Sequence, residues 1–415
     1  MDGIKNVVII GASAGGAQTA RALQKRLPVT HRIVLIEANE FAFWIVGALR
    51  AAVMPGYENK VFASLDTIFP ATSRHILLKK MRVVEIASDH VRLDRVAPAP
   101  FESDRIEVDV GIISTGLCYP YPMVPFSQNW QESINAFRCT QADIAAAKNV
   151  VILGGGAVGV EFAGEVRELH RDTQITLLER SPQLLKGWRE PLHAQLLAQL
   201  ERLSVDVRLN TSIQVTDELR ASAYRLLSPV QQLAVSDGTK VDCDFLFIGT
   251  GGGANASALN SDALTDSVQV RKSESRSTPP RYVDVDPRTL RLKYEPLQAR
   301  WFCVGDAANT SDPKTYSAAE DHARVVADQV LGQVLNISSG LKEHSKATSL
   351  MSVSLGTSGG ATQLVWPVFG KLFTSLIKSR SLGLSAFKNR YSAVFAPDST
   401  SDARTDDLRP LAPFK

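Results

Sequence analysis

Two stretches of this sequence have the pattern of a turn that lets a protein backbone contact a pyrophosphate. Residues 7–20 read VVIIGASAGGAQTA, and residues 150–165 read VVILGGGAVGVEFAGE. In both, an apolar run leads into a glycine-rich turn and then a helix, the local order that a dinucleotide fingerprint requires. The first copy has Ser13 where the pattern usually has its second glycine. The repetition predicts an α/β fold with two nucleotide-binding units.

Each turn is followed by a second buried strand that ends in an acid. The segments are RIVLIE at 32–37 and QITLLE at 174–179, so the acids are Glu37 and Glu179. A carboxylate at this place can accept hydrogen bonds from both hydroxyls of an adenosine ribose. A lone glycine fingerprint is weak evidence. Two complete strand-turn-helix-strand units with acids at matching positions strongly indicate two Rossmann-type domains.

The glycines of the two turns have different tasks. Gly11 permits the tight turn, and Gly16 allows the helix to pack closely on the strand. The helix N-terminus then offers free N–H groups and a partial positive charge to a pyrophosphate. The second unit supplies Gly154, Gly156 and Gly159. The alternative for either turn is a purely structural bend without a ligand. Two nucleotide sites in one chain make chemical sense, however, because one can hold a bound redox cofactor and the other a soluble hydride donor.

A third segment is paired with the first unit. The stretch FCVGD at 302–306 is a strand followed by Gly-Asp, which brings a carboxylate to a sheet edge where it can bind a polyol hydroxyl. The segment from 115 to about 248 then looks inserted, and it carries the second unit. The sequence STG at 114–116 would leave the first domain, and GTG at 249–251 would return to it.

The remaining pattern predicts strands and helices around the two units. Alternating residues at 76–95 predict a small antiparallel sheet. Further strands are expected at 108–114, 205–215, 231–236, 243–250, 300–304 and 350–355, and helices at 17–27, from the second turn to about 170, at 316–334 and at 366–378. The polar segment 265–281 is expected to be a loop, and the tail from about 396 to be disordered.

Composition and cysteine spacing exclude several functions. A net charge of only +3 without a dense basic block makes nucleic acid a poor partner. The start MDGIKNVVII leaves no room for a signal peptide, and no apolar run is long enough for a membrane span, so a cytoplasmic protein is expected.

The four cysteines, at 118, 139, 243 and 303, have neither C-x2-C nor C-x4-C spacing. No metal site and no redox dithiol are therefore predicted.

Over roughly residues 5–335, this layout resembles the flavoprotein reductases with two dinucleotide-binding domains. Four longer stretches resemble the apoptosis-inducing-factor-like quinone reductases, which include the ferroptosis suppressor proteins and relatives of type II NADH dehydrogenases. They are FAFWIVGALRAAVMPGYENKVFASL (41–65), STGLCYPYP (114–122), VGDAANTSDPKTYSAAEDHA (304–323) and SLGTSGGATQL (354–364). The resemblance implies hydride transfer from NAD(P)H to FAD and then reduction of a quinone-like acceptor.

The resemblance also implies a glutathione-reductase-like domain order. The FAD-binding domain would comprise 1–122 and 249–335, with an inserted NAD(P)H-binding domain at 123–248. A small C-terminal α+β domain would follow at 336–395, and a disordered tail at 396–415.

The resemblance also assigns residues to the two cofactors. The FAD contacts would be Gly11, Ser13, Glu37, Arg50, Lys60, Thr115, Gly116 and Asp306, and the NAD(P)H site would be lined by Gly154, Gly156, Gly159, Glu161 and Glu179. Further cofactor-binding residues would be Ala14, Gly15, Ala38, Val84, Val158, Gly251 and Gly305. A carboxylate such as Glu179 repels a 2′-phosphate and favours NADH, but Arg180 beside it could serve NADPH.

The segment after Gly-Asp supplies the predicted catalytic residues, Lys314 and Tyr316. Lys314 could stabilise negative charge on the reduced flavin, since a nearby cation favours that form. The alternative is a solvated loop lysine. His322 could approach the flavin, although a surface or helix-packing role is the simpler reading.

The acceptor and the partners stay open. The apolar stripe of 366–378 suits a membrane surface or a lipid-soluble acceptor, but it could also pack on the protein itself or at a homodimer interface. The unusual stretches 41–57 and 251–260 would also fit a tailoring oxidoreductase that acts on a specialised aromatic metabolite. A flavoprotein whose cofactors regulate its dimerisation is a third hypothesis.

Overall fold

The computed structural model describes residues 3–266, 281–346 and 350–391. The chain divides into two compact units. Unit 1 comprises 1–42, 64–119 and 252–348, and unit 2 comprises 43–63, 120–251 and 349–415. The predicted tail and most of the predicted loop at 265–281 lie outside the described residues.

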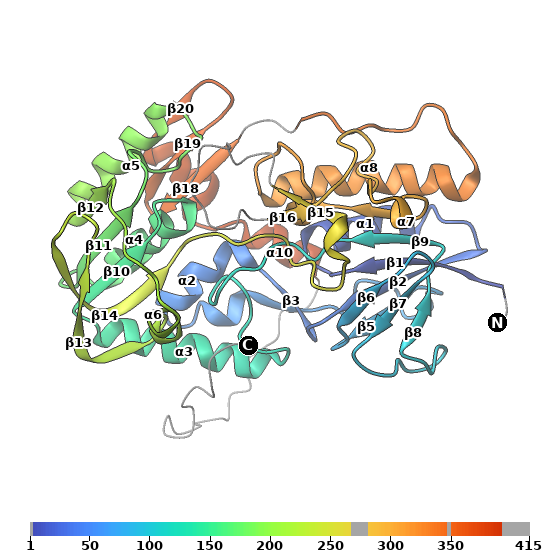
Figure 1. The fold of residues 1–415 in the computed structure, drawn as a ribbon, viewed down its shortest axis with the longest axis horizontal. Helices are drawn as coiled ribbons and strands as arrows, with labels where there is room; N and C mark the ends of the chain where they lie inside the picture. The colour runs from blue at the N-terminus through green and yellow to red at the C-terminus, as the bar shows by residue number, and fades with distance from the viewer. Residues whose placement is uncertain (1–2, 267–280, 347–349, 392–415) are drawn as a thin grey trace. The chain divides into compact units, whose positions relative to one another are not determined.

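Unit 1 is built on a five-stranded parallel sheet. Its strands, in spatial order, are β17 (Trp301–Cys303), β9 (Val110–Ile113), β1 (Lys5–Ile10), β2 (His31–Glu37) and β5 (Ile76–Lys79). Strands β1, β2, β9 and β17 are almost continuously apolar and buried, as parallel strands covered on both faces should be, whereas the edge strand β5 is mostly half-buried. Helices α1 (Ala14–Gln24) and α8 (Tyr316–Leu335) pack against each other beside the sheet (Figure 1).

The antiparallel sheet predicted at 76–95 is only partly confirmed. Strands β6 (Val83–Ile86), β7 (His90–Leu93) and β8 (Arg105–Glu107) form an antiparallel sheet. Residues 76–79 instead extend the main sheet, because β5 pairs in parallel with β2. Unit 1 also contains β15 (Leu264–Asp266), β16 (Arg281–Val283), and the short helix α7 (Glu295–Gln298).

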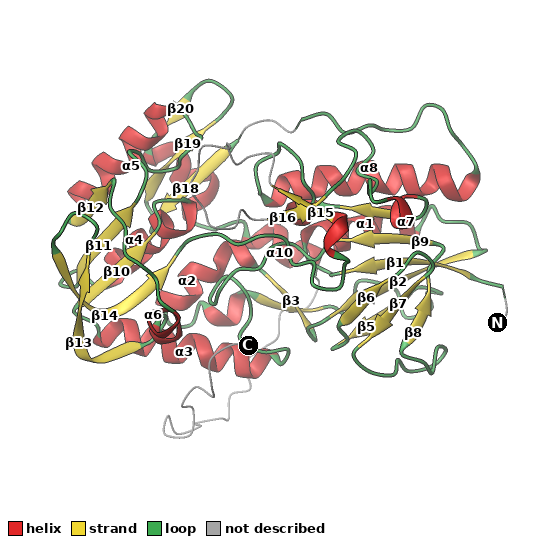
Figure 2. Ribbon diagram, in the orientation of Figure 1, coloured by secondary structure: helices red, strands yellow, loops and turns green. Residues whose placement is uncertain are grey.

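Unit 2 repeats the parallel core. Its sheet has the order β12 (Val205–Leu209), β11 (Gln174–Glu179), β10 (Asn149–Leu153), β14 (Lys240–Ile248) and β13 (Leu226–Ala234), with only β13 antiparallel to its neighbour. Its helices are α2 (Ala48–Val53), α3 (Trp130–Ala146), α4 (Ala157–Leu169), α5 (Glu190–Arg202) and α6 (Asp217–Ser222) (Figure 2). Short strands β3 (Phe41–Phe43) and β4 (Phe62–Ser64) lie where the chain passes from one unit to the other and back.

Residues 43–63 group with unit 2, although the sequence placed them in the first part of the FAD domain. Helix α2 packs against α3 and α4, and its Leu49 and Val53 join the buried core of unit 2. The apolar face of this short helix therefore decides which unit it joins.

The C-terminal segment adds an antiparallel sheet to unit 2. Strands β18 (Met351–Leu355), β19 (Gly359–Gln363) and β20 (Val368–Phe369) precede α9 (Lys371–Thr374), a π-helical turn (Ser375–Ser379) and α10 (Leu384–Arg390). The single helix predicted at 366–378 is wrong in its first turn. Phe369 pairs with Thr362, and the α-helix begins only after Gly370.

Candidate functional site

The first glycine turn has no space for a side chain at Gly11 or Gly16. Gly11 has φ +97°, and a Cβ built on it would lie 2.7 Å from the carbonyl oxygen of Ser114. A Cβ on Gly16 would lie only 1.8 Å from the carbonyl oxygen of Gly11. The Ser114 hydroxyl donates to the carbonyl oxygens of Ile10 and Gly11, 2.8 Å away in each case. The turn is thus locked between β1 and β9, with α1 leaving at once.

Ser13 is the N-cap of α1, and its exposed side chain makes no capping hydrogen bond. Its carbonyl oxygen accepts the N–H of Ala17 at 2.9 Å, which starts the helix. Ala14, Gly15 and Gly16 form the buried first turn of α1, where backbone N–H groups have no partner within the helix. This is the arrangement that receives an anionic group at a helix N-terminus.

Glu37 and Glu179 hold the two turns in the same way. Glu37 accepts the N–H of Ala12 at 2.7 Å with one oxygen and the N–H of Asn39 at 3.0 Å with the other. Burial raises the pKa of Glu37, and these hydrogen bonds oppose the shift. Glu179 accepts the N–H of Gly155 at 2.6 Å and that of Ser181 at 2.7 Å. Each carboxylate therefore sits beside its glycine turn, as the sequence predicted.

The second turn is equally closed at its base and open at its tip. Gly154 has φ +107°, and its N–H donates to Leu178 at 2.9 Å. A Cβ on Gly159 would lie 2.0 Å from the carbonyl oxygen of Gly154, whereas nothing lies within 4 Å of a Cβ on Gly156. Val158 lies in the first turn of α4. Gly251, beyond the end of β14, also has open space around it.

Asp306 and Lys314 lie together in unit 1. Gly305 has φ +72° and starts a short helical turn that presents Asp306 directly after β17. Burial raises the pKa of Asp306 to about 6, and the charge of Lys314 opposes this shift. Lys314 Nζ donates to the carbonyl oxygen of Ala308 at 2.6 Å and lies 4.7 Å from the ring centroid of Tyr282. It is half-buried and anchored, so the solvated-loop alternative is wrong.

A buried hydroxyl near the end of β9 supports a ligand in unit 1. Thr115 Oγ1 is buried and has no hydrogen-bond partner among the described residues. Gly116, next along the chain, has φ +69°, and its carbonyl oxygen accepts the N–H of Asn255 at 2.9 Å. A buried unpartnered hydroxyl is costly unless a ligand or water satisfies it. The hydroxyl, the glycine cradle and the carboxylates of Glu37 and Asp306 together fit FAD.

Two predicted FAD contacts lie outside unit 1. Arg50, 1% exposed, forms a two-pronged ion pair with Glu165 at 2.8 and 2.7 Å and donates to the carbonyl oxygen of Gly356 at 3.0 Å. Lys60 is exposed, and its Nζ lies 5.2 Å from the ring centroid of Tyr57. All of these partners belong to unit 2, so these contacts give the predicted FAD roles no support.

Three further predicted residues have less specific surroundings in unit 1. Val84, 37% exposed, lies on β6 in the small antiparallel sheet. Ala38 follows Glu37 at the end of β2 and is half-buried. Tyr316 is the first residue of α8, capped by Thr315, whose hydroxyl accepts the N–H of Ala318 at 3.3 Å.

Glu161 has partners that the sequence did not suggest. Its Oε1 accepts the N–H of Ser354 at 2.9 Å and Nζ of Lys378 at 2.5 Å. Gly164, one turn further along α4, is needed here, because a Cβ on it would lie 2.6 Å from Cα of Leu355. The shared stretch SLGTSGG at 354–360 was the available signal, since it forms the β18–β19 hairpin against α4.

Neither the cysteines nor a cavity of unit 2 adds a reactive group to these sites. All four cysteines are free, and burial raises the pKa of Cys303 to about 12, so it is an unreactive thiol at neutral pH. A cavity of about 480 Å³ is lined by Asn149, Gln174 and Asp206, at the start of β10, β11 and β12. Nucleotides bind at the carboxyl ends of such strands, so this cavity is at the wrong edge.

The model of the pyridine nucleotide-disulphide oxidoreductase family matches residues 5–288 of the chain. The chain therefore belongs to the pyridine nucleotide-disulphide oxidoreductase family, and it is a flavin-dependent pyridine nucleotide oxidoreductase. FAD and NAD(P)H are the cofactors typical of this family. Its two parallel sheets have the α/β fold of reductases with two dinucleotide-binding domains, as predicted.

Known relatives support the narrower resemblance. Fe-regulated protein 8 of Mycosarcoma maydis is 27% identical over 85% of the chain and 87% of its own length. Apoptosis-inducing factor homolog B of Dictyostelium discoideum is 25% identical over 93% and 96%. Human ferroptosis suppressor protein 1 is 25% identical over 92% and 95%. The chain is thus a distant homologue of the apoptosis-inducing-factor-like and ferroptosis-suppressor-like proteins, over nearly the full length of each.

Solved structures agree on the fold. The sulfide:quinone oxidoreductase of Aquifex aeolicus gives a TM-score of 0.67 at 16% identity, covering 94% of this chain and 92% of its own. NDH2 of Plasmodium falciparum in complex with NADH gives 0.65 at 11%, covering 94% and 99%. At these identities the likeness concerns the fold alone.

Proposed function

We propose that the chain is an NAD(P)H:quinone-type oxidoreductase that uses FAD. The observation that carries this is the pair of glycine turns, each held by its own glutamate, in a chain without a redox dithiol. A bound FAD would supply the chemistry of accepting hydride from the nicotinamide and of releasing electrons singly or in pairs. A chain that lacks a dithiol has no thiol relay for these electrons, so a small aromatic acceptor that meets the cofactor directly is the simplest recipient.

The residues of unit 1 have separable tasks in this proposal. The first turn of α1 binds the pyrophosphate, Glu37 binds the adenosine ribose, and Asp306 binds a polyol hydroxyl. Lys314, held by its hydrogen bond to Ala308, supplies a positive charge that acts on Asp306. Tyr316, the first residue of α8, remains the second predicted catalytic residue. Fixed charges of this kind need no reorganisation when negative charge develops.

In unit 2 we assign NADH as the preferred donor. Both oxygens of Glu179 already accept backbone N–H groups, so the carboxylate is fixed beside the second turn. A fixed negative charge repels the 2′-phosphate of NADPH. The neighbouring Arg180 is exposed and leaves NADPH tolerated rather than excluded.

The names of two proteins that share the fold suggest the acceptor and the donor to test, a quinone and NADH. One solved neighbour is a sulfide:quinone oxidoreductase, and another is an NDH2 in complex with NADH. The decisive experiment is steady-state turnover of the purified holoprotein with NADH and a panel of acceptors. Reduction of menadione or a short-chain ubiquinone, with no activity toward disulfides, is expected. Efficient disulfide reduction, or failure with every simple quinone, would contradict the proposal and favour a specialised aromatic substrate.

We further propose that the C-terminal segment contacts a membrane surface. In unit 2, Val365, Trp366, Leu372, Leu376 and Ile377 are 55%, 74%, 82%, 73% and 45% exposed. No acidic residue occurs from 344 to 397, whereas this stretch contains six lysines and arginines. Exposed apolar side chains in a purely basic segment suit an anionic bilayer, where lipid-soluble quinones are found.

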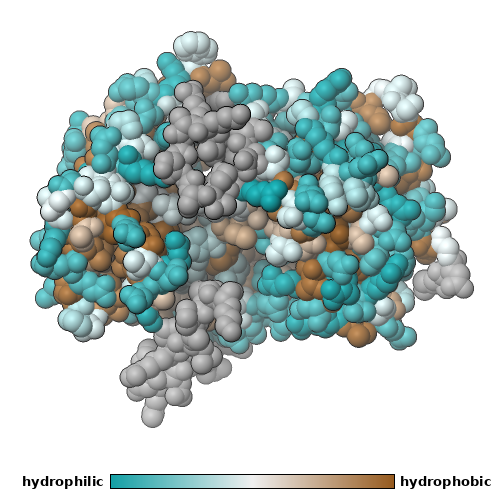
Figure 3. Space-filling view, viewed as in Figure 1, coloured by the Kyte–Doolittle hydropathy of each residue, from teal (hydrophilic) through white to brown (hydrophobic). Residues whose placement is uncertain are grey.

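None of the helices among the described residues is long and apolar enough to cross a bilayer. On the face in Figure 3, hydrophobic residues reach the surface in separate groups among hydrophilic ones. The test is flotation with vesicles of phosphatidylcholine alone or with phosphatidylserine. We expect the wild-type protein to bind the vesicles that contain phosphatidylserine. We expect the double variant Leu372→Glu/Leu376→Glu to lose this binding. If wild type binds no vesicles but forms a dimer in solution, and the double variant is monomeric, the surface would instead serve self-association.

A further inference from the structure

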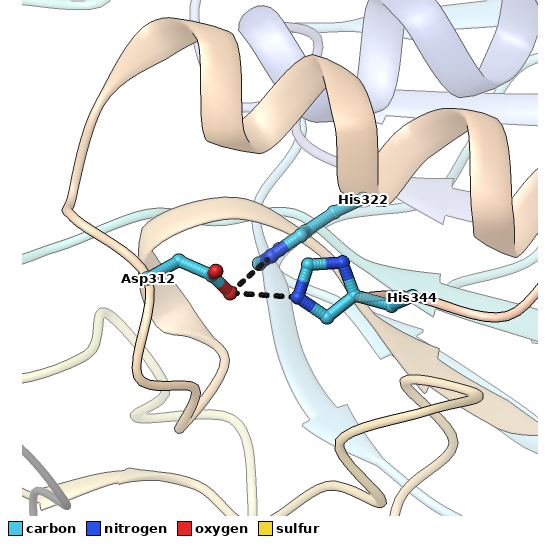
Figure 4. A group of neighbouring side chains, drawn as sticks. All are labelled: Asp312, His322 and His344. Carbon is cyan, nitrogen blue, oxygen red and sulfur yellow. Dashed lines mark hydrogen bonds and ion pairs between the residues drawn. The ribbon is translucent and has the colours of Figure 1, made fainter. Parts of the chain in front are cut away.

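Three side chains form a buried polar cluster around helix α8. Asp312 precedes the helix, His322 lies on it, and His344 lies in the segment that follows it (Figure 4). Asp312 and His322 are each 1% exposed, and the side chain of His344 is 6% exposed. One oxygen of Asp312, Oδ2, lies 3.0 Å from Nε2 of His322 and 2.9 Å from Nε2 of His344. The cluster thus joins three separate stretches of unit 1.

The other nitrogen of His322 contacts the flavin-binding turn. Nδ1 lies 3.1 Å from the backbone N–H of Gly305, which can only donate. Nδ1 must therefore be the unprotonated, accepting nitrogen, and in the neutral ring the proton is on Nε2. That proton is donated to Asp312. A single tautomer satisfies both contacts, and burial lowers the pKa of His322, which keeps the ring neutral.

This tautomer argues against a metal ion, although an aspartate and two histidines are common ligands. A metal at Nε2 of His322 needs the lone pair of that nitrogen, and the ring would then carry its proton on Nδ1. A protonated Nδ1 would point at the N–H of Gly305, donor against donor. One ligand atom of each residue lies within 4.8 Å of the other two. Nε2 of His322 nevertheless carries a proton that it donates to Asp312, so it has no lone pair to offer a metal.

We propose that His322 is a positioning residue for FAD, held in its working tautomer by Asp312 and His344. Gly305 has φ +72°, and a Cβ on it would lie 3.2 Å from Cβ of Ala319 on α8, so its turn is packed directly on the helix that carries His322. The hydrogen bond from Gly305 sets the direction in which the next residue, Asp306, presents its carboxylate. The inference rests on the proposed FAD site of unit 1.

The two nitrogens of His322 can be tested separately. In His322→Asn, the amide oxygen replaces Nδ1 and can still accept from Gly305, but the contact with Asp312 is lost. In His322→Gln, the amide nitrogen replaces Nε2 and can still donate to Asp312, but the acceptor for Gly305 is lost. FAD affinity of the deflavinated proteins is measured by quenching of flavin fluorescence, and the midpoint potential of the bound flavin by equilibration with a dye.

We expect His322→Gln to bind FAD about tenfold more weakly, as loss of one buried hydrogen bond predicts, and to shift the potential. His322→Asn should remain within about threefold of wild type. The matched control is His75→Gln. Buried His75 also accepts a backbone N–H at Nδ1, from Ile33 at 3.0 Å, but it directly precedes β5 and contacts β2. This variant should lose stability without losing FAD affinity.

Each outcome decides a different point. Equal FAD affinity in both His322 variants and wild type would overturn the positioning role while leaving the proposed function standing. Absence of FAD binding in wild type would instead overturn the proposed function. One equivalent of zinc in the purified protein, lost in His344→Asn, would overturn the tautomer assignment and make the cluster a metal site.

Discussion

The two glycine turns have the same backbone framework and differ in what surrounds it. Both begin with a left-handed glycine, both need a glycine five residues later, and both are held by a glutamate from the next strand. The turn of unit 1 has Ser13 at its tip and is accompanied by Asp306 and a buried unpartnered Thr115 hydroxyl. The turn of unit 2 has Gly156 at its tip. We interpret the first as built to retain its ligand and the second to exchange it.

The glycine at the base of the turn should give the largest effect. In Gly16→Ala the new methyl group would lie 1.8 Å from the carbonyl oxygen of Gly11, so the turn must open. We expect loss of bound FAD and a free energy of unfolding reduced by more than about 3 kcal/mol. Gly156→Ala is the control, since its methyl group meets nothing within 4 Å. Full flavin content in purified Gly16→Ala would contradict the closeness of this approach.

The tip of the turn should give the next largest effect. Ser13→Gly is expected to retain FAD, whereas Ser13→Val should release it. Ser13 is the N-cap of α1 and makes no capping hydrogen bond with its side chain, so a branched side chain there would crowd the phosphate that we propose binds at this helix N-terminus. The readout is the ratio of absorbance at 450 to 280 nm after gel filtration. A valine variant with the flavin content of wild type would show that the phosphates lie further from Ser13.

The charge of Asp306 should lower the stability of the protein without FAD and strengthen its binding of FAD. Its pKa is raised to about 6, so its charge destabilises the empty fold above that pH, and the penalty disappears as pH falls from about 6 to about 4. Asp306→Asn should stabilise the deflavinated protein at pH 8 by about 2 kcal/mol, have no such effect at pH 4, and bind FAD at least tenfold more weakly. Urea unfolding at both pH values measures this. A variant less stable than wild type at pH 8 would contradict the sign.

The smallest effect is expected at the adenosine ribose of unit 2. Glu179→Gln should lower the preference for NADH over NADPH severalfold, because the negative charge is removed. The amide oxygen can keep only one of the two backbone contacts of Glu179, with Gly155 or with Ser181. Glu37→Gln is the comparison in unit 1, where FAD binding and not nucleotide preference should weaken. The kcat/KM values for both nucleotides decide the matter, and an unchanged ratio in Glu179→Gln would make Arg180 the specificity residue.

The sequence predicted what repeats locally and missed what depends on distant contacts. Glu37, Glu179 and the glycines follow from short spacings, and the structure places them beside the turns as expected. Residues 366–378 have helical spacing, but pairing of Phe369 with Thr362 and the break at Gly370 convert the first turn into a strand. Arg50 was transferred by resemblance, and its buried partner Glu165 lies 115 positions away in the chain. No short pattern joins Asp312 to His344.

The most direct test of the central claim is anaerobic titration of the gel-filtered protein with NADH, followed at 450 nm. We predict one tightly held FAD per chain, bleached by one equivalent of NADH. In Gly159→Val, which blocks the second turn, FAD should stay bound and unbleached. Colourless wild-type protein, or a Gly159→Val variant whose flavin is reduced as readily as that of wild type, would contradict the assignment of the two turns.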